Sequence, residues 1–217
     1  MKTFVIPDLH GRYDLLRDAL ATIQGLAIEG TVVFLGDYVD RGPQSKQIID
    51  RLIQGPPPGW KWVCLRGNHE DMLLECHDTD DDHLRHWWAR NGGETTLQSY
   101  GGQIDPSHIE WFKSCLTVYA DAHRVYVHAG VGEHYELADQ PEQMTQWYKY
   151  PKGADVGYHG RHVVHGHDAS NGPAFYTNRT NLDARAYASG RLCIGAFDDQ
   201  QPGGHITILW VGVNSRG

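Results

Sequence analysis

The stretch Gly36-Asp37-Tyr38-Val39-Asp40-Arg41-Gly42 decides how this chain is interpreted. It directly follows Thr31-Val32-Val33-Phe34-Leu35, an apolar run with the length and composition of a buried strand. In open α/β sheets, ligands bind beyond the carboxyl ends of the strands. Three charged side chains between two glycines at such an end therefore indicate a polar loop that contributes to a binding site.

The same arrangement recurs at every other strand that we predict outside the C-terminal region. Asp8-Leu9-His10-Gly11 follows the strand Thr3–Ile6, and Arg66-Gly67-Asn68-His69-Glu70 follows Trp62–Leu65. His128-Ala129-Gly130 comes after Arg124–Val127, and His165-Gly166-His167 comes after His162–Val164. Five polar motifs at five strand ends are expected to converge on one site.

The intervening segments predict the fold class. Apolar residues recur at helical spacing in Tyr13–Ile23 and Ser45–Ile53, which gives a β-α-β-α-β order and an α/β sheet. Residues from about 71 to 115 are expected to be mainly helical. Residues from Arg191 to Val213 alternate like two antiparallel strands joined at Gln201-Pro202-Gly203-Gly204. We expect residues 1–217 to form a single domain.

The chemistry of the five motifs points to metal ions. Their Asp, His and Asn side chains offer oxygen and nitrogen ligands without a thiolate, which suits Mn, Fe or Zn. A carboxylate can bridge two ions, which in such sites lie about 3.5–4 Å apart and activate a shared water. Taken singly, each motif is more simply a helix cap, a tight turn or a structural histidine. Their occurrence in order at successive strand ends favours the metal site.

The bulk composition excludes several classes of protein. A formal net charge of −8 and a pI of about 5.9 argue against a nucleic-acid backbone as the partner. Four cysteines without a C-x-x-C pair are typical of reduced thiols in a cytoplasmic protein. The first apolar run is interrupted at Pro7, too early for a signal peptide, and no run is long enough to cross a membrane. The acidic residues from Asp78 to Asp82 are expected to form a solvated loop.

The motifs that end the first three strands resemble the signature of the phosphoprotein phosphatase family within the calcineurin-like metallophosphoesterases. Trp88-Ala89-Arg90-Asn91-Gly92-Gly93-Glu94-Thr95-Thr96-Leu97 and the segment Asp183–Leu192 are similar to its small bacterial and phage branch, which includes lambda phosphatase. The resemblance runs from about Asp8 to Leu192. It implies a four-layer α/β/β/α sandwich and a hydrolase that acts on phosphoproteins or small phosphoesters.

The resemblance also implies a role for each site residue. Asp8 and His10 would hold one ion, Asp37 would bridge, and the second ion would be held by Asn68, His128 and His167. His69 would be the general acid, which the neighbouring carboxylate of Asp40 would orient and keep protonated. The phosphate would be bound by Arg41, Asn68 and Lys149. The ions are expected to be two Mn²⁺, with Fe or Zn as alternatives. A hydroxide shared by the ions would attack phosphorus, and no phosphoenzyme would form.

Three positions depart from the family pattern. Trp147-Tyr148-Lys149 stands where the branch usually has Trp-x-Arg, so Lys149 would supply charge without the bidentate fork of arginine. Asp168 replaces the usual Thr after Gly-His, and could weaken anion binding or help to hold metal. Arg185 lies in a modified Asp-Thr-Gly-Ala pattern, where a second phosphate-binding cation and a surface role are both open.

Two enzymatic substrates and one non-enzymatic role are compatible with these motifs. The first is a protein phosphatase for phosphoserine or phosphothreonine, with phosphotyrosine as a further substrate. The alternative is a dinucleoside polyphosphate hydrolase such as a diadenosine tetraphosphatase, and Asp40 favours the first. A metal-binding regulator without activity is disfavoured, because such a protein needs no acid like His69 and no phosphate-binding Arg41.

Overall fold

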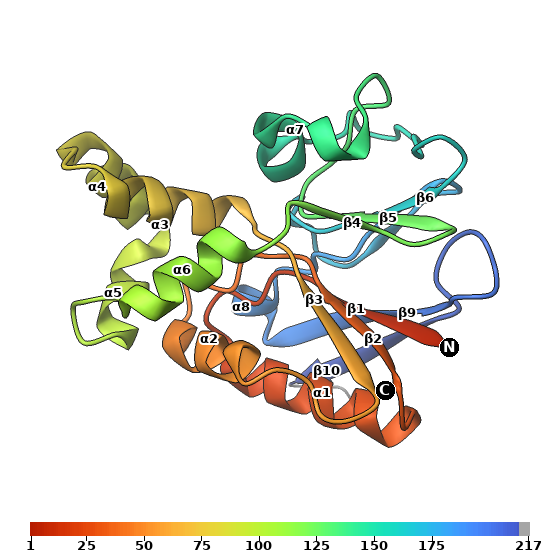
Figure 1. Cartoon of the computed structure of the whole chain (residues 1–217), viewed down its shortest axis with the longest axis horizontal. Helices are drawn as coiled ribbons and strands as arrows, with labels where there is room; N and C mark the ends of the chain where they lie inside the picture. The colour runs from red at the N-terminus through yellow and green to blue at the C-terminus, as the bar shows by residue number, and fades with distance from the viewer. Residues whose placement is uncertain (213–217) are drawn as a thin grey trace.

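The computed structural model describes residues 1–212 and contains two mixed five-stranded sheets packed face to face (Figure 1). In the first sheet the order is β10-β9-β1-β2-β3. Strands β1, β2 and β3 run parallel, and β9 runs antiparallel to both β1 and β10. The bounds of these strands are β1 Lys2–Ile6, β2 Gly30–Phe34, β3 Trp60–Cys64, β9 Arg191–Asp198 and β10 Thr207–Gly212.

The second sheet has the order β4-β5-β6-β8-β7. Its three central strands β5, β6 and β8 are parallel, and the two edge strands pair antiparallel with their neighbours. The bounds are β4 Val118–Ala120, β5 Arg124–Val127, β6 His162–His165, β7 Ala174–Phe175 and β8 Arg179–Asn181.

Alternation along the strands separates two apolar cores. Phe4 and Ile6 of β1 face the helices that cover the first sheet, and Val5 faces the other way. Val5 packs between the sheets in the same cluster as Val164 and Leu182. Successive side chains of a strand point to opposite faces, so an apolar run that is buried on both faces forms the central layer of a sandwich.

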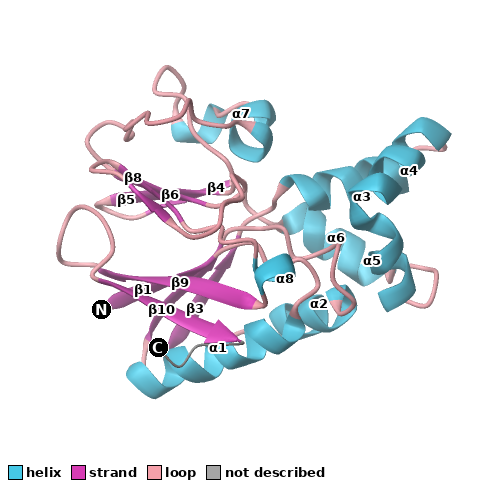
Figure 2. Ribbon diagram, turned by 180° about the vertical axis from the view of Figure 1, so that it is seen from behind, coloured by secondary structure: helices cyan, strands magenta, loops and turns pink. Residues whose placement is uncertain are grey.

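Helices form the outer layers of this sandwich. α1 (Tyr13–Leu26) and α2 (Ser45–Ile53) cover the first sheet, and the short α7 (Glu142–Trp147) lies on the side of the second sheet (Figures 1 and 2). The α/β/β/α architecture expected from the sequence is confirmed. The predicted α2 has the observed bounds, and the predicted C-terminal hairpin is formed by β9 and β10. Val213, the last residue of that prediction, lies outside the described residues.

A group of helices projects from one end of the sandwich (Figure 2). Asp81 accepts a hydrogen bond from the His83 backbone at the start of α4, so part of the acidic run caps a helix in an exposed turn. No helix of the described chain is long and apolar enough to cross a membrane. The helices of the projecting group are α3 Asn68–Asp78, α4 Asp82–Trp88, the kinked turn η1 Ala89–Gly93, α5 Glu94–Ser99 and α6 Pro106–Ser114.

Candidate active site

The loops that follow β1, β2, β3, β5 and β6 meet at one end of the sandwich, where they place most of the sequence-predicted site residues together. These side chains come from distant parts of the chain, yet most of them are almost completely buried. His167 is half-buried, and Arg41 and Lys149 are exposed. The residues with relative exposures of 4% or less are Asp8, His10, Asp37, Asp40, Asn68, His69 and His128.

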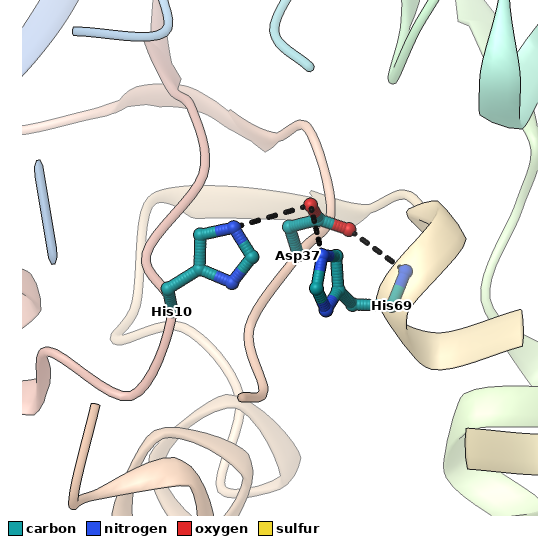
Figure 3. Close-up of side chains that lie close together, drawn as sticks. All are labelled: His10, Asp37 and His69. Carbon is teal, nitrogen blue, oxygen red and sulfur yellow. Dashed lines mark hydrogen bonds and ion pairs between the residues drawn. The ribbon is translucent and has the colours of Figure 1, made fainter. Parts of the chain in front are cut away.

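Asp37 lies at the centre of this group. One carboxylate oxygen, Oδ2, is 3.4 Å from Nε2 of His10 and 3.9 Å from Nε2 of His69 (Figure 3). The other oxygen, Oδ1, is 3.5 Å from Nε2 of His128. Two sets of potential metal ligands therefore share Asp37, one with His10 and His69 and one with Asp8 and His128. The first set includes His69, which the sequence interpretation had placed outside the metal ligands.

Hydrogen bonds to the backbone fix which imidazole nitrogens carry lone pairs. Nδ1 of His10 donates to the carbonyl of Val39 at 2.8 Å, and Nδ1 of His128 donates to that of Leu35 at 3.0 Å. The Nε2 atom of each neutral ring then carries a lone pair. In His128 this lone pair faces Oδ1 of Asn68 at 2.9 Å, so two acceptors point at each other. A cation is the chemical group that such an arrangement accommodates.

His167 adds a further lone pair to this cluster. Its Nδ1 lies 3.0 Å from Oδ1 of Asn68, and its Nε2 is buried without a hydrogen-bond partner among the described residues. Buried polar atoms are rarely left unpaired, and those that are require an explanation. Together with the nitrogen and oxygen donors around Asp37, this orphaned atom fits a site for divalent metal ions. We call the six predicted metal ligands, Asp8, His10, Asp37, Asn68, His128 and His167, the strand-end cluster.

The electrostatics of the cluster agree with this interpretation. Burial raises the pKa of Asp8 well above its usual value, and the neighbouring Asp183 raises it further. The pKa of Asp37 is raised by burial and then by the proximity of Asp8. Crowded, buried carboxylates are costly unless positive charge compensates them. Asp183 was quoted in the sequence motif without a role, and its effect on Asp8 places it beside the cluster.

The backbone at the site is held in an uncommon conformation. His10, Asp37, Asp40, Arg41 and His167 all have positive φ angles, between 43° and 70°. Residues other than glycine rarely adopt this region, and when they do they often cluster at functional sites. A tight backbone contact supports the turns, because a side chain on Gly42 would collide with the carbonyl of His10.

Glu70 is a structural residue of the site whose role the sequence interpretation missed. Its buried carboxylate accepts hydrogen bonds from the backbone N–H groups of Asp37, Tyr38 and Gly67 at 2.8–2.9 Å. It thereby joins the loop after β2 to the first turn of α3. Glu70 stands three residues after Gly67 at the helix start and accepts from the Gly67 backbone N–H, which is the acidic half of a capping box and could have indicated this role.

Asp40 and His69 form a buried pair. Nδ1 of His69 lies 2.7 Å from Oδ2 of Asp40. The same carboxylate accepts hydrogen bonds from the indole of Trp88 at 3.0 and 3.1 Å and from the hydroxyl of Thr96 at 2.7 Å. Trp88 and Thr96 belong to the stretch Trp88–Leu97, which was expected to be helical but was assigned to the site only through family resemblance. Their contact with Asp40 gives that stretch a physical function.

One sequence-based expectation about this pair is corrected by the electrostatics. A carboxylate beside His69 was expected to keep the imidazole protonated. Instead, burial lowers the pKa of His69 well below its usual value, and the positive charge of Arg41 lowers it further. Burial also raises the pKa of Asp40 to about 7. Asp40 thus orients the ring, but it does not charge the ring in this environment.

Arg41 projects across the site between two histidines. Its guanidinium donates to Nε2 of His10 at 2.6 Å and to Nε2 of His69 at 3.0 Å. The guanidinium carbon also lies 4.7 Å from the centre of the Tyr187 ring, within cation–π distance. Tyr187 belongs to the short helix α8 (Ala186–Ser189) and was not identified from the sequence. Arg41 is thus an exposed cation whose donors reach the centre of the site.

The three departures from the family pattern occupy different places. Lys149 is exposed on the loop after α7, and its charge contributes, after burial, to lowering the pKa of His167 to about 4. It therefore lies near the cluster. Asp168 acts on the pKa of His167 in the opposite direction. Arg185 is exposed beside a separate surface hollow, with Ala184 and Ala188.

Comparison with known proteins identifies relatives of this chain. The family model described as calcineurin-like phosphoesterase matches residues 1–183. Serine/threonine-protein phosphatase 2 of Escherichia coli strain K12 is 34% identical over 91 residues, which cover 42% of this chain and 38% of that protein. The chain thus spans about two fifths of the length of this relative.

Two further relatives match over more of their length. The asymmetrical bis(5'-nucleosyl)-tetraphosphatase PrpE of Anoxybacillus flavithermus is 27% identical over 184 residues, covering 74% of this chain and 73% of that protein. The crystal structure of a proposed diadenosine tetraphosphatase superposes with a TM-score of 0.71 at 21% identity, covering 98% of this chain and 94% of the other. At that identity the superposition shows a shared fold.

Proposed function

Because this chain belongs to the calcineurin-like phosphoesterase family, we propose that it is a metal-dependent phosphomonoester hydrolase that acts on phosphoserine or phosphothreonine in proteins. The observation that carries this proposal is the His69–Asp40 pair beside the strand-end cluster, with a Nδ1–Oδ2 distance of 2.7 Å. Such a pair provides an oriented proton donor for a leaving oxygen. We place the chain in the bacterial and phage branch of the phosphoprotein phosphatases.

The ligands of two divalent ions are the first part of the proposal. Asp8 and His10 would hold one ion, Asp37 would be shared, and the second ion would be held by Asn68, His128 and His167. When bound, such ions neutralise charge on phosphoryl oxygens and lower the pKa of bound water towards about 7. Mn²⁺ suits this donor set, and Fe or Zn would also fit.

Binding of the phosphoryl group is assigned to the cations at the site. Arg41 can present two parallel donors to phosphate oxygens once it exchanges its contacts with His10 and His69. Lys149, whose charge acts on the pKa of His167, supplies a second positive charge, as a point charge without a fork. Asn68 contributes its amide.

His69 would protonate the leaving oxygen. An alkoxide leaves poorly without a proton, so a positioned acid contributes about 10²–10⁴-fold. The imidazole is neutral before substrate binds, because burial and Arg41 lower its pKa. A dianionic phosphoryl group at Arg41 would bring negative charge beside the ring, and nearby negative charge favours the protonated form. Asp40 holds Nδ1 so that Nε2 points to the reacting group.

A second substrate class is supported by a specific observation. The relative that acts on bis(5'-nucleosyl) tetraphosphates aligns with 74% of this chain, more than the 42% covered by the serine/threonine phosphatase. A dinucleoside polyphosphate hydrolase would use the same metal ligands. It would depend less on His69, because a nucleotide phosphate is a better leaving group than an alkoxide.

One experiment separates the two substrates. The purified full chain, reconstituted with Mn²⁺, is assayed side by side on phosphoserine and phosphothreonine peptides and on diadenosine tetraphosphate. The proposal predicts a higher kcat/KM on at least one of the peptides. A higher kcat/KM on diadenosine tetraphosphate would show that the chain is a dinucleoside polyphosphate hydrolase and not a protein phosphatase. If none of these substrates were hydrolysed, both proposed activities would be rejected.

A further inference from the structure

The helices that project from the sandwich line a cavity of about 610 Å³ that is open to solvent on one side, which we call the lobe cavity. It lies among α3, α4 and α5 and the loop that leads to α6, in the part of Figure 1 where those helices gather. Its volume is in the range of small-molecule sites, about 300–1,000 Å³. None of the predicted metal ligands lines it. The apolar part of its wall is formed by Leu73, Cys76, Trp88, Ala89, Leu97 and Ile104.

Trp88 connects this cavity to the candidate active site. Trp88 lines the cavity, and its indole Nε1 donates to the carboxylate of Asp40 at 3.0 and 3.1 Å. Asp40 in turn lies 2.7 Å from Nδ1 of His69. Trp88 thus lies between the lobe cavity and the His69–Asp40 pair, which we propose to deliver the proton to the leaving oxygen.

The segment around Trp88 makes two further contacts with the active-site loop. The hydroxyl of Thr96 donates to Asp40 at 2.7 Å, and the carbonyl of Gly92 accepts from the backbone N–H of Arg41 at 3.3 Å. The chain is kinked here, with a φ of 106° at Gly92. Gly93 packs so closely on the Trp88 indole that an added side-chain carbon would lie 2.5 Å from the ring. Trp88 thus has little space on the side of Gly93, and its segment is joined to the active-site loop by these contacts.

The charges at the rim indicate what the cavity would bind. Arg85 is already occupied, because it donates to Asp80 at 2.6 Å and to Asp82 at 3.2 Å. Glu94 is exposed at the rim and has no ion-pair partner among residues 1–212. A phosphate or carboxylate ligand would meet an unpaired carboxylate, whereas an ammonium group would be attracted to it. The surrounding wall favours an apolar body for the rest of the ligand.

We propose that the lobe cavity is a regulatory site for a small molecule with an apolar, ring-containing body and one protonated amine, which acts on His69 through Trp88 and Asp40. The body packs against Trp88 and Leu97, and the ammonium group lies beside Glu94. The effect on turnover rests on the role proposed for His69. Binding, and the response of Trp88, are independent of that role and can be measured without catalysis.

Binding is tested with three probes that share a naphthalene body and differ in charge. Calorimetry on the full chain compares 1-naphthylmethylamine, neutral 1-naphthalenemethanol and anionic 1-naphthoate. We expect saturable binding of one amine per chain, weaker binding of the alcohol and the weakest binding of the acid. Glu94→Gln is expected to weaken binding of the amine by about two- to fivefold, as for an exposed ion pair, and to leave binding of the alcohol unchanged.

Two variants test whether binding occurs in the lobe cavity. Gln103→Trp narrows its exposed rim, and Ala89→Leu fills part of its wall, so either folded variant should bind the amine more weakly. Gln103 is exposed, so its replacement does not disturb the apolar core. Equal affinity of the amine for wild type, Glu94→Gln and Gln103→Trp would overturn the proposed site.

Coupling to the active site is tested by the indole N–H resonance of Trp88, identified by its absence in Trp88→Phe. In the metal-free chain, saturating 1-naphthylmethylamine should shift this resonance, and the shift should disappear in Gln103→Trp. No shift at saturation would overturn the coupling. A shift without any phosphatase activity of the reconstituted enzyme would support the site while rejecting the proposed function, so the two failures are distinguishable.

Discussion

Two histidines at the end of β6, His165 in the strand and His167 in the loop that follows, belong to two different buried polar clusters. His165 uses both ring nitrogens within the chain, since Nδ1 donates to the carbonyl of Gly166 at 3.0 Å and Nε2 accepts from Arg179 at 3.0 Å. His167 leaves its buried Nε2 without a partner among the described residues. The two rings are separated by one glycine, yet one is satisfied by the fold and the other is not.

The environments of these histidines differ in the same way. Around His165, the guanidinium of Arg179 donates to the carbonyl of Ala154 at 2.8 Å and lies over the rings of Tyr150 and Tyr176. We call these residues the Arg179 cluster. Around His167, acceptors of the strand-end cluster face one another, and carboxylates are crowded. A polar cluster that satisfies itself stabilises the fold, whereas one that leaves lone pairs converging is suited to bind a cation.

The largest effect that we expect is the loss of activity when metal is removed from the strand-end cluster. Removing divalent ions with a chelator should abolish hydrolysis of p-nitrophenyl phosphate, because the converging lone pairs and carboxylates then have no cation to activate water. Adding Mn²⁺ should restore the activity, as followed by absorbance of the released phenolate. Full activity in a sample shown to be free of metal would contradict the role of this cluster.

The next effect concerns His69, at the edge of the strand-end cluster. His69→Asn should slow hydrolysis of a phosphoserine peptide by about 10²–10⁴-fold, because its alkoxide leaving group requires a proton. The loss on p-nitrophenyl phosphate should be much smaller, since its leaving group is already stable as an anion. The two kcat values of wild type and variant decide this, and equal losses on both substrates would exclude His69 as the general acid.

The Arg179 cluster should respond in stability rather than in metal binding. Arg179→Met leaves the carbonyl of Ala154 and Nε2 of His165 without their donor, so we expect the free energy of unfolding to fall by about 2–3 kcal/mol. Urea titration measures this change, with Arg179→Lys as the matched control that retains the charge. A variant that keeps wild-type stability but loses bound metal would reverse the distinction between the two clusters.

The smallest effect is a pH dependence of stability. Burial, followed by the charge of Arg179, lowers the pKa of His165 to about 3, whereas an unfolded histidine has a pKa of about 6.5. Between these values the unfolded state binds a proton that the folded state does not, so stability falls as the pH drops below about 6.5. Between pH 7 and pH 5, the free energy of unfolding of wild type should fall by about 1–2 kcal/mol more than that of His165→Asn. Identical losses in urea titrations at the two pH values would refute this assignment.

The strand ends were predictable from sequence because local patterns determine them. An apolar run followed at once by Asp8 or Asp37 identifies both the strand and the loop, and parallel strands bring such loops to the same end of the sheet. The histidines are a different case. His165 ends β6 and His167 lies two residues further on, and the contact with Arg179 of β8 distinguishes the buried structural ring from the one that faces Asn68.

Contacts over long sequence separations account for what the sequence did not reveal. The hydrogen bonds from Trp88 and Thr96 to Asp40 join residues 48 and 56 positions apart, and they depend on how the helices pack against the loop after β2. The low pKa of His69 follows from its burial and from the position of Arg41. The spacing of a motif encodes neither these hydrogen bonds nor this pKa. Pairing His69 with Asp40 from the sequence therefore predicted their contact but not the charge state of the His69 ring.

The central claim is that the strand-end cluster holds two ions and that both depend on Asp37. Counting metal by mass spectrometry, after reconstitution with Mn²⁺ and removal of the excess, tests it most directly in wild type and in Asp37→Asn, with Arg179→Met as a control outside the cluster. We predict two Mn²⁺ per chain in wild type and in the control, and fewer than one in Asp37→Asn. Two tightly bound ions in Asp37→Asn, or none in the wild-type chain, would contradict the account.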